Sequence, residues 1–307
     1  MPVLERDPWR LQYFEHVPCP EHVNIPTDDP DCWVLYPRER WVYDKLKIAE
    51  AQGLDAGPHG VHPRRFPVFS KPMVNLKGMG LGSRVMRSAA ELDHHYRPGH
   101  MWMPLLTGDH VSTDCAVENG RAAWMRHATG AAWDDGMFRH WTVHAGPIPA
   151  LGAHLADWVL RHMPGYSGMM NFETIGGTII EAHLRFADQW CDLYGEGWVE
   201  ALVRLYAEGR WAFADDDRRD GVSMPLFARH GSGFRHPPAE LQREVRAMEG
   251  VKSLQITFHD GKPPEDHAMP PGGFRLAVVN ATSLEAARAA RRRLATAWDA
   301  ARVLSQD

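Results

Sequence analysis

The sequence predicts an α+β fold, with mixed helices and strands that pair through hairpins. Segments such as "KSLQITFHDG" (252–261) alternate apolar and polar side chains, which is typical of a half-buried strand. Asn-Gly at 119–120 and Gly-Gly at 176–177 are turn signals of hairpins. The stretch 283–304 has apolar residues at helical spacing, with Ser283 as its N-cap. Local antiparallel pairing therefore fits better than a purely parallel sheet.

The expected elements follow one another along the chain. Residues 1–43 are rich in proline, aspartate and aromatic side chains and predict an irregular arm packed by its tryptophans. A helix over 39–53 carries a partial apolar stripe and stops at Gly53. Then come a strand at 66–72, a glycine-rich loop at 75–83, a helix at 88–96, a strand at 100–108, a hairpin at 109–130, a helix at 148–164, a second hairpin at 171–185, a helix at 197–211, strands at 222–234, 252–261 and 272–283, and the closing helix.

Composition changes along the chain indicate four units. The polar segment "FADDDRRDG" is the clearest boundary, because it lies between an amphipathic helix and a run of strands. The units are an N-terminal arm at 1–43, a first subdomain at 44–100, a second at 101–214, and a C-terminal α/β unit at 215–307.

Bulk composition excludes several classes of protein. The 307 residues contain 44% hydrophobic and 24% charged residues, as in ordinary globular proteins. A formal net charge of -5 gives no general attraction to nucleic acid or to anionic membranes. The first residues lack the blocks of a signal peptide, and no apolar run approaches the length of about 20 residues that spans a bilayer. The scattered cysteines (Cys19, Cys32, Cys115 and Cys191) predict reduced thiols in a cytoplasmic protein, without a zinc site.

The stretch "SKPMVNLKGMGLGS" is the strongest local signal of a ligand site. Lys71 ends a strand, Lys77 follows in the loop, and the loop contains Gly78, Gly80 and Gly82. Such a loop can present backbone N–H groups and ammonium charges to phosphates. The glycine spacing matches neither a Walker A loop nor a dinucleotide-binding fingerprint. The alternative is a flexible hairpin without a ligand.

The stretch "NFETIGGTIIEAHLR" places two carboxylates in β-branched, apolar surroundings. A two-residue Gly-Gly turn pairs Ile175 with Thr178, and perfect register would then leave Glu173 and Glu181 out of line. A bulge or a longer turn would be needed to bring them together, and Gly176-Gly177 makes one plausible. Two adjacent carboxylates repel unless a cation lies between them, and Mg²⁺ is the natural candidate beside phosphates. The alternative is a pair of edge-strand charges that bond Arg185 and solvent.

Taken in order, five segments between about residues 44 and 210 resemble the ATP-grasp superfamily. They are "YDKLKIAEAQGLDAGP", "FPVFSKP", "LKGMGLGS", "LLTGDHVSTDCAVENG" and "NFETI…IIEAHLRF". The resemblance implies two α+β subdomains that grip ATP, followed by a small C-terminal β-rich domain. It also implies that Lys45 contacts phosphate, that Lys71 bridges the α-phosphate and adenine, and that the glycine-rich loop closes over the β- and γ-phosphates.

The same resemblance assigns the remaining site residues. Glu173, Glu181 and His183 would hold the metal, and Arg185 and Lys77 would act on the transferring phosphoryl group. The remaining ATP-binding residues are Gly78, Gly80, Gly82, Ser83, Met103 and Leu105. His183 stands where the family usually has asparagine, so Mn²⁺ or a metal-free role is the alternative to Mg²⁺.

An ATP-dependent ligase is the expected function, activating a carboxylate as an acyl phosphate for attack by an amine or another nucleophile. The alternatives are a kinase on the same scaffold and a catalytically altered nucleotide-binding partner protein. The expected substrates are a small-molecule carboxylate and a nucleophile. The resemblance implies that the family's N-terminal substrate domain is missing or shrunk to about 43 residues. The tryptophan-rich arm that remains would either cover the substrate site or form a homodimer contact.

Overall fold

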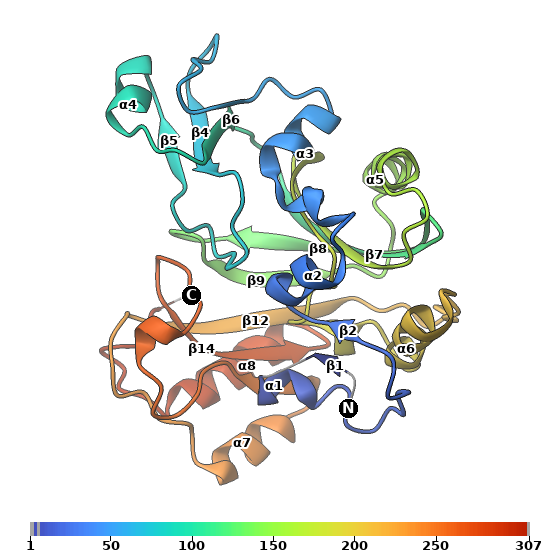
Figure 1. The fold of residues 1–307 in the computed structure, drawn as a ribbon. Helices are drawn as coiled ribbons and strands as arrows, with labels where there is room; N and C mark the ends of the chain where they lie inside the picture. The colour runs from blue at the N-terminus through green and yellow to red at the C-terminus, as the bar shows by residue number, and fades with distance from the viewer. Residues whose placement is uncertain (1–2, 5–6, 306–307) are drawn as a thin grey trace.

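Three sheets organise the chain. The structure is a computed structural model that describes residues 3–4 and 7–305. An eight-stranded sheet, a four-stranded sheet and a two-stranded ribbon account for the strands (Figure 1). The small sheet lies at the top of Figure 1, and the long strands of the large sheet cross the middle and lower parts. The predicted α+β class is confirmed.

The elements have the following bounds. The strands are β1 (Val3–Leu4), β2 (Ile25–Pro26), β3 (Gly57–Pro58), β4 (Val68–Pro72), β5 (Arg84–Met86), β6 (His100–Pro104), β7 (His110–Glu118), β8 (Arg121–Ala132), β9 (Phe138–Val143), β10 (Gly168–Ile175), β11 (Thr178–His183), β12 (Gly221–Ala228), β13 (Val251–Ile256) and β14 (Phe274–Ala281). The α-helices are α1 (Pro8–Leu11), α2 (Asp29–Leu35), α3 (Lys45–Ala51), α4 (Ala89–His94), α5 (Pro149–His162), α6 (Trp198–Glu208), α7 (Ala239–Arg246) and α8 (Leu284–Ala295). Three 3₁₀ turns are η1 (Arg40–Tyr43), η2 (Cys191–Leu193) and η3 (Pro264–Asp266).

Both main sheets run across the limits predicted for the subdomains. The large sheet has the order β11-β10-β7-β8-β9-β12-β14-β13, and its neighbours are antiparallel. Its β9–β12 pairing joins the strands before and after the predicted boundary at 214/215. The small sheet has the order β3-β6-β4-β5, so β6 belongs with β4 although it extends beyond residue 100. The division of the chain into domains stays a prediction.

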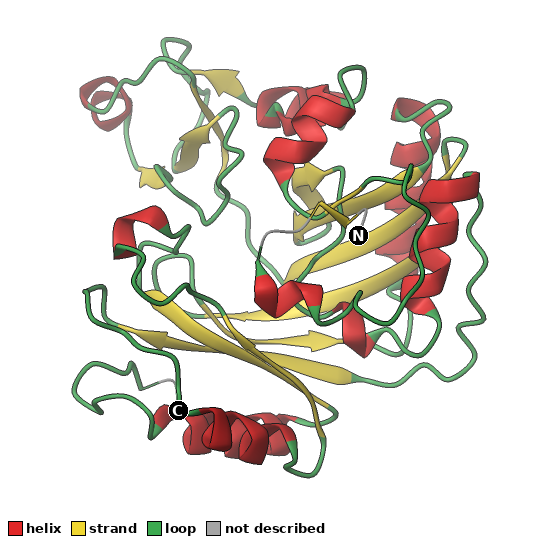
Figure 2. Cartoon of the chain, turned by 60° about the horizontal axis from the view of Figure 1, so that its bottom comes forward, coloured by secondary structure: helices red, strands yellow, loops and turns green. Residues whose placement is uncertain are grey.

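Apolar side chains cover both faces of the large sheet. On one face, Trp158 of α5 packs against Phe172 of β10, with ring centroids 5.4 Å apart. On the other face, Trp198 of α6 packs with Trp124 of β8. Helices α7 and α8 form a third core with β12, β13 and β14. Figure 2 shows helices on both sides of the strands.

The N-terminal arm differs from the irregular segment that the sequence predicted. It contains α1 and α2, and β2 pairs with β1. Asp28 caps α2 by accepting the N–H of Asp31 at 2.8 Å. Cys32 of α2 is fully buried, and its Sγ donates to the Leu184 carbonyl oxygen at 3.2 Å. These elements are too short for hydrophobic periodicity to reveal them, and their stability comes from tertiary packing.

Local start and stop signals were more reliable than exact helix lengths. Ser283 caps α8 through Ala286 N–H, as predicted, but the helix ends at Ala295 rather than near residue 304. The helix expected over 39–53 is interrupted at Asp44, whose carboxylate caps α3 after the 3₁₀ turn η1. Strand β9 and helix α7 were not expected.

The structure also bears on two predictions from composition. The cysteines are free thiols, and Cys32, Cys115 and Cys191 are buried. No helix within residues 3–4 and 7–305 is long and apolar enough to cross a membrane.

Candidate ATP and metal site

The hairpin of β10 and β11 brings the two predicted acids together. Glu173 and Glu181 are direct cross-strand partners, whereas Thr174 pairs with Ile179. The extra residue, Ile180, forms the bulge that the sequence required, although the bulge lies beside Glu173 rather than at the glycine turn. Cross-strand partners project to the same face, so both carboxylates are on one side of the sheet. Their side chains keep 32% and 21% of their surface exposed, respectively.

Gly176 fixes the turn of this hairpin against the preceding linker. Its φ is +56°, and its N–H donates to the Asp109 carbonyl oxygen at 3.0 Å. A Cβ at this position would overlap the Thr107 carbonyl oxygen. Gly177 has a φ of +84°, but a Cβ there would meet no atom within 4 Å. Of these two turn residues, only Gly176 therefore requires glycine both for its backbone conformation and for the close approach of the Thr107 carbonyl oxygen.

This difference predicts unequal costs for two neighbouring alanine substitutions. Gly177→Ala should lower the free energy of unfolding by about 1–2 kcal/mol, through the left-handed backbone alone. Gly176→Ala should cost about 3 kcal/mol or more, because backbone atoms must also move. Urea unfolding of the two variants measures the difference. Equal costs would mean that the Gly176–Thr107 contact does not constrain the hairpin.

Two buried lysines contact β11 at or next to Glu181, where the small sheet approaches this strand. Lys45, at the start of α3, is buried, and its Nζ lies 2.8 Å from Glu181 Oε1. Lys71, on β4, is also buried, and its Nζ donates to the Ile180 carbonyl oxygen at 2.7 Å. Burial lowers the pKa of Lys71 to about 8; Glu181 opposes this shift and Lys45 reinforces it. The cluster holds two ammonium groups against one carboxylate, an arrangement that suits an additional anion.

The lowered pKa of Lys71 gives a pH prediction. Below about pH 8 Lys71 is protonated and can bind a phosphate, and above it the neutral amine cannot. Affinity for ADP should therefore fall as pH rises through this value, by up to about tenfold per pH unit. Calorimetric titrations on both sides of pH 8 measure the slope. Lys71→Arg, which stays charged, should flatten it; an equally steep decline in this variant would exclude Lys71 as the titrating group.

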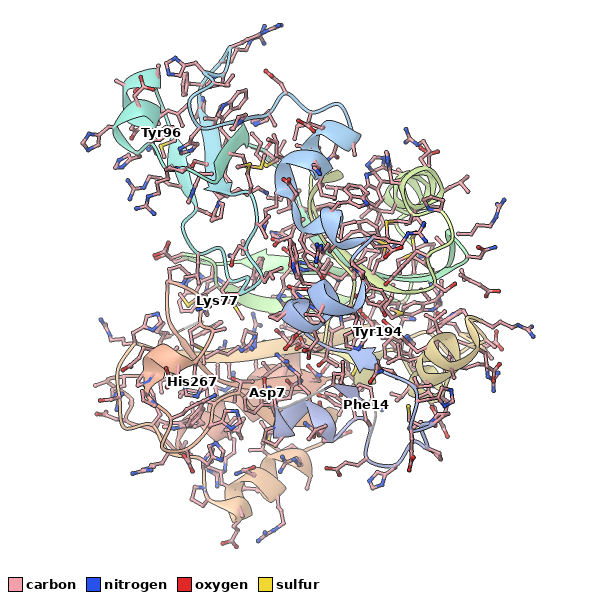
Figure 3. The ribbon with its side chains drawn as sticks, viewed as in Figure 1. Asp7, Phe14, Lys77, Tyr96, Tyr194 and His267 are labelled. Carbon is pink, nitrogen blue, oxygen red and sulfur yellow. The ribbon has the colours of Figure 1, made fainter. Side chains whose placement is uncertain are left out.

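The glycine-rich loop extends from the small sheet toward the large one. Gly78, Gly80 and Gly82 all have positive φ, and Met79 between them has a φ of 62°. The Asn75 side chain braces the loop, accepting Lys77 N–H at 3.0 Å and donating to the Gly78 carbonyl oxygen at 2.9 Å. Lys77 is exposed on this loop, and Figure 3 shows it where the loop comes down beside the green strands of the large sheet. The Met79 carbonyl oxygen lies 3.4 Å from the Cβ position of Gly136, so the loop touches the β8–β9 connection.

An apolar cluster lies beside Lys71. Met103 is buried in it, and Leu106 and Ile180 pack against it. The predicted Leu105 is 40% exposed, so Leu106 supplies the apolar side chain here instead. Such a surface next to a buried ammonium group suits a flat heterocycle.

The three predicted metal ligands do not form a preassembled site. Glu173 Oε2 lies 3.0 Å from His110 Nε2, Glu181 is paired with Lys45, and His183 Nδ1 hydrogen-bonds Asp29. In the described part of the chain, no group of three or more His, Cys, Asp or Glu side chains is arranged to hold a metal ion. Glu173 and Glu181 alone fit a hard cation, because they offer carboxylate oxygens from one face and leave other positions for phosphate oxygens.

Asp29 is a site residue that the sequence analysis missed. It is 4% exposed, and it accepts hydrogen bonds from His183 Nδ1 at 3.0 Å and from Arg185 Nη2 at 3.1 Å, while its Oδ1 lies 3.0 Å from Arg185 Nε. Burial alone would raise the pKa of Asp29, but Arg185 and His183 outweigh burial and hold the pKa well below its usual range. Asp29 belongs to a proline- and aspartate-rich stretch that carries no recognisable motif, so only the fold reveals its role.

Arg275 of β14 was also missed. Its Nη1 makes one long hydrogen bond, 3.4 Å to Gln189 Oε1, and its buried Nε has no partner among the residues that the structure describes. Burial lowers the pKa of Arg275, and the negative charge of Asp188 opposes this. Gln189 closely follows Arg185 in the chain and is held by Ser223, to which its Nε2 donates at 2.9 Å. A half-buried guanidinium with so little compensation can receive an anionic group.

Comparison with solved structures supports the architecture. An L-amino acid ligase from Bacillus licheniformis superposes with a TM-score of 0.61 at 14% identity, over 93% of this chain and 81% of that one. N5-carboxyaminoimidazole ribonucleotide synthetase from Thermus thermophilus gives 0.59 at 15%, over 97% and 84%. N5-carboxyaminoimidazole synthase from Aspergillus clavatus, in complex with ADP and aminoimidazole ribonucleotide, gives 0.58 at 8%, over 94% and 88%. This chain therefore has the ATP-grasp fold, as its motifs predicted.

Sequence comparison adds no closer relative. No protein-family model matches the chain, and no curated protein matches it. The similarity to these ligases is therefore one of fold.

Proposed function

We propose that this protein is an ATP-dependent ligase that activates a carboxylate as an acyl phosphate for attack by an amine or another nucleophile. The observation that carries the proposal is the Lys45–Glu181–Lys71 cluster, with Glu173 paired beside Glu181. It lies where the two sheets meet, in a chain with the fold of ATP-dependent ligases. The structural relative with bound ADP is consistent with a nucleotide in this place.

Each residue of the cluster has a part in binding ATP. Lys71 and Lys45 neutralise phosphate charge, the glycine-rich loop with Lys77 and Ser83 covers the β- and γ-phosphates, and the apolar cluster around Met103 receives the adenine. Glu173 and Glu181 would hold Mg²⁺, which when bound draws electron density from the phosphate oxygens. The leading metal is magnesium because the two residues on the open face are carboxylates, while His183 is engaged by Asp29.

The proposed reaction has two steps. A substrate carboxylate oxygen attacks the γ-phosphorus, the bond to the β–γ bridging oxygen breaks, and ADP leaves. The nucleophile then attacks the acyl carbon, the carbon–oxygen bond to phosphate breaks, and its proton passes to solvent. Arg185 stabilises charge on the transferring phosphoryl group and on the acyl phosphate. Activation is necessary because phosphate is a far better leaving group than an oxide ion.

Arg275 supplies a prediction about the acid substrate or its acceptor. Arg275→Met should raise KM for an anionic substrate by about 30-fold or more, because a half-buried charge partner is lost. It should leave ADP affinity unchanged and not lower the free energy of unfolding, since a poorly compensated, half-buried cation is removed. Steady-state kinetics and calorimetry measure these effects, with the exposed Arg243→Met on α7 as the matched control. An unchanged KM would remove Arg275 from the substrate site.

The test of the proposed function is a screen of carboxylate and amine pools for ADP and phosphate release, followed by trapping with hydroxylamine. A ligase should give an ATP-dependent hydroxamate. A kinase would instead give a stable phosphorylated product.

One observation favours a second candidate, a nucleotide-binding protein without ligase activity. Asp29 already compensates the charge of Arg185, and His110 already bonds Glu173. Such a protein would show a nucleotide-induced rise in melting temperature but neither product.

A further inference from the structure

The N-terminal arm places a buried carboxylate in contact with the end of β11. Asp29 Oδ1 lies 3.0 Å from Arg185 Nε, and Oδ2 accepts from Arg185 Nη2 at 3.1 Å. The hydrogen bond and the close ion-pair contact join one carboxylate to two nitrogens of the same guanidinium, and together they restrict its orientation. Arg185 Nη1 donates to the Phe186 carbonyl oxygen at 3.2 Å. The Asp29 contacts involve Nε and Nη2, so the second N–H of Nη1 is left for another anion.

The same carboxylate orients His183. Both oxygens of Asp29 are 3.0 Å from His183 Nδ1. An ionised carboxylate only accepts hydrogen bonds, so Nδ1 carries the proton of this bond. The opposite nitrogen, Nε2, lies 4.0 Å from Glu181 Oε1. One residue of the arm thus restrains two side chains: His183, which follows Glu181 on the same face of β11, and Arg185, which lies just past the end of that strand.

Packing holds Asp29 firmly in this position. Helix α2 begins at Asp29, is capped by Asp28, and buries Cys32 against Leu184. The Tyr43 hydroxyl accepts the Leu184 N–H at 3.2 Å, so the chain between His183 and Arg185 is also held. Buried ion pairs contribute little net folding stability compared with apolar packing. Their contribution is to hold the paired side chains in one geometry.

We propose that Asp29 is a positioning residue of the phosphoryl-transfer site, acting through Arg185, so that the N-terminal arm completes the site. This inference rests on the proposed function, because it requires a nucleotide phosphate within reach of Arg185. Asp29 contacts no substrate itself. It orients the Arg185 guanidinium so that Nη1 meets the transferring phosphoryl group, in the way that supporting residues orient catalytic groups.

The test compares full-length variants in two titrations: Mg-ADP alone, and Mg-ADP with fluoroaluminate, which stands in for the transferring phosphoryl group. Asp29→Asn should leave affinity for ADP alone within about twofold of the wild type and weaken the fluoroaluminate complex by about 10- to 100-fold. Arg185→Ala should cause a similar loss, and the double variant should lose no more than Arg185→Ala. Asp28→Asn is the matched control, since asparagine also caps helices and the same charge is removed one residue away.

Several outcomes would overturn the proposal. The first two are an equal loss of affinity for ADP and for ADP with fluoroaluminate in Asp29→Asn, and no loss of affinity for either. A third is a loss in the double variant that equals the sum of the losses in Asp29→Asn and Arg185→Ala. A fourth is a tighter fluoroaluminate complex in Asp29→Asn, which would mean that Asp29 holds Arg185 away from the nucleotide. Wild type that binds ADP without any gain from fluoroaluminate would also overturn it while leaving nucleotide binding intact. Wild type that binds no ADP would overturn the proposed function and this inference with it.

A second measurement covers the case in which Asp29→Asn does not fold. Asp29→Glu keeps the charge but moves the carboxylate, and its fluoroaluminate complex should be weaker by about tenfold, with ADP affinity retained. Nitrogen-15 NMR of the wild-type histidines should show His183 with its proton on Nδ1. A proton on Nε2 only would contradict the proposed orientation.

Discussion

Glu181→Gln is expected to reduce Mg-ATP turnover by about 10³-fold or more while the protein remains folded. Glutamine has the shape of glutamate and keeps an oxygen for Lys45, whose Nζ lies 2.8 Å from Glu181 Oε1. It removes the negative charge that would hold a cation beside the phosphates. ADP release in the presence of the identified substrates measures the loss.

The control for this variant is Glu196→Gln, at an exposed position before α6. It should turn over ATP at the wild-type rate. Undiminished turnover in Glu181→Gln would mean that the carboxylate pair on β10 and β11 is not the metal site. A loss of the folded state, seen by circular dichroism, would instead assign Glu181 a structural role.

Lys71→Met is expected to have the second largest effect, and its two consequences have opposite signs. Affinity for ADP should fall by about 100-fold, because a buried ammonium group next to the phosphates is lost. The free energy of unfolding should stay the same or rise, since methionine fills similar space without the cost of burying a charge. Calorimetry and urea unfolding measure the two effects separately.

A matched control is Lys47→Met, because Lys47 is exposed on α3, where the buried Lys45 also lies. It should change neither quantity appreciably. Wild-type ADP affinity in Lys71→Met would remove Lys71 from the nucleotide site. Weaker affinity together with marked destabilisation would point to a structural contact through the Ile180 carbonyl oxygen instead.

The sequence predicted those parts of the fold that depend on short-range signals. The turns, the capping serine Ser283 and the stop at Gly53 each follow from the chemistry of one or two residues. The need for a bulge or a longer turn between Glu173 and Glu181 followed from counting residues around a two-residue turn, and the structure has a bulge. Its position did not, because packing of the sheet rather than the turn decides where the extra residue lies.

The site was less predictable where residues from distant segments meet. Asp29 and Arg185 are 156 positions apart in the chain, and no local pattern links them. In the sequence Arg275 has no feature that distinguishes it from other strand residues. The structure shows that its guanidinium has only a long hydrogen bond to Gln189 and that its buried Nε has no partner among the described residues. Leu106 rather than Leu105 packs into the apolar cluster, because the side-chain direction changes at the end of β6. The homodimer and the cytoplasmic location stay predictions from the sequence.

The transfer of a carboxylate oxygen to phosphate tests the proposed function most directly. Carboxylate pools labelled with oxygen-18 would be incubated with the protein, Mg-ATP and amines, and the released phosphate analysed by mass spectrometry. An acyl phosphate intermediate predicts that each phosphate released carries one labelled oxygen from the acid. Phosphate released without label would show that ATP is cleaved by water or by another acceptor, and would contradict the ligase mechanism.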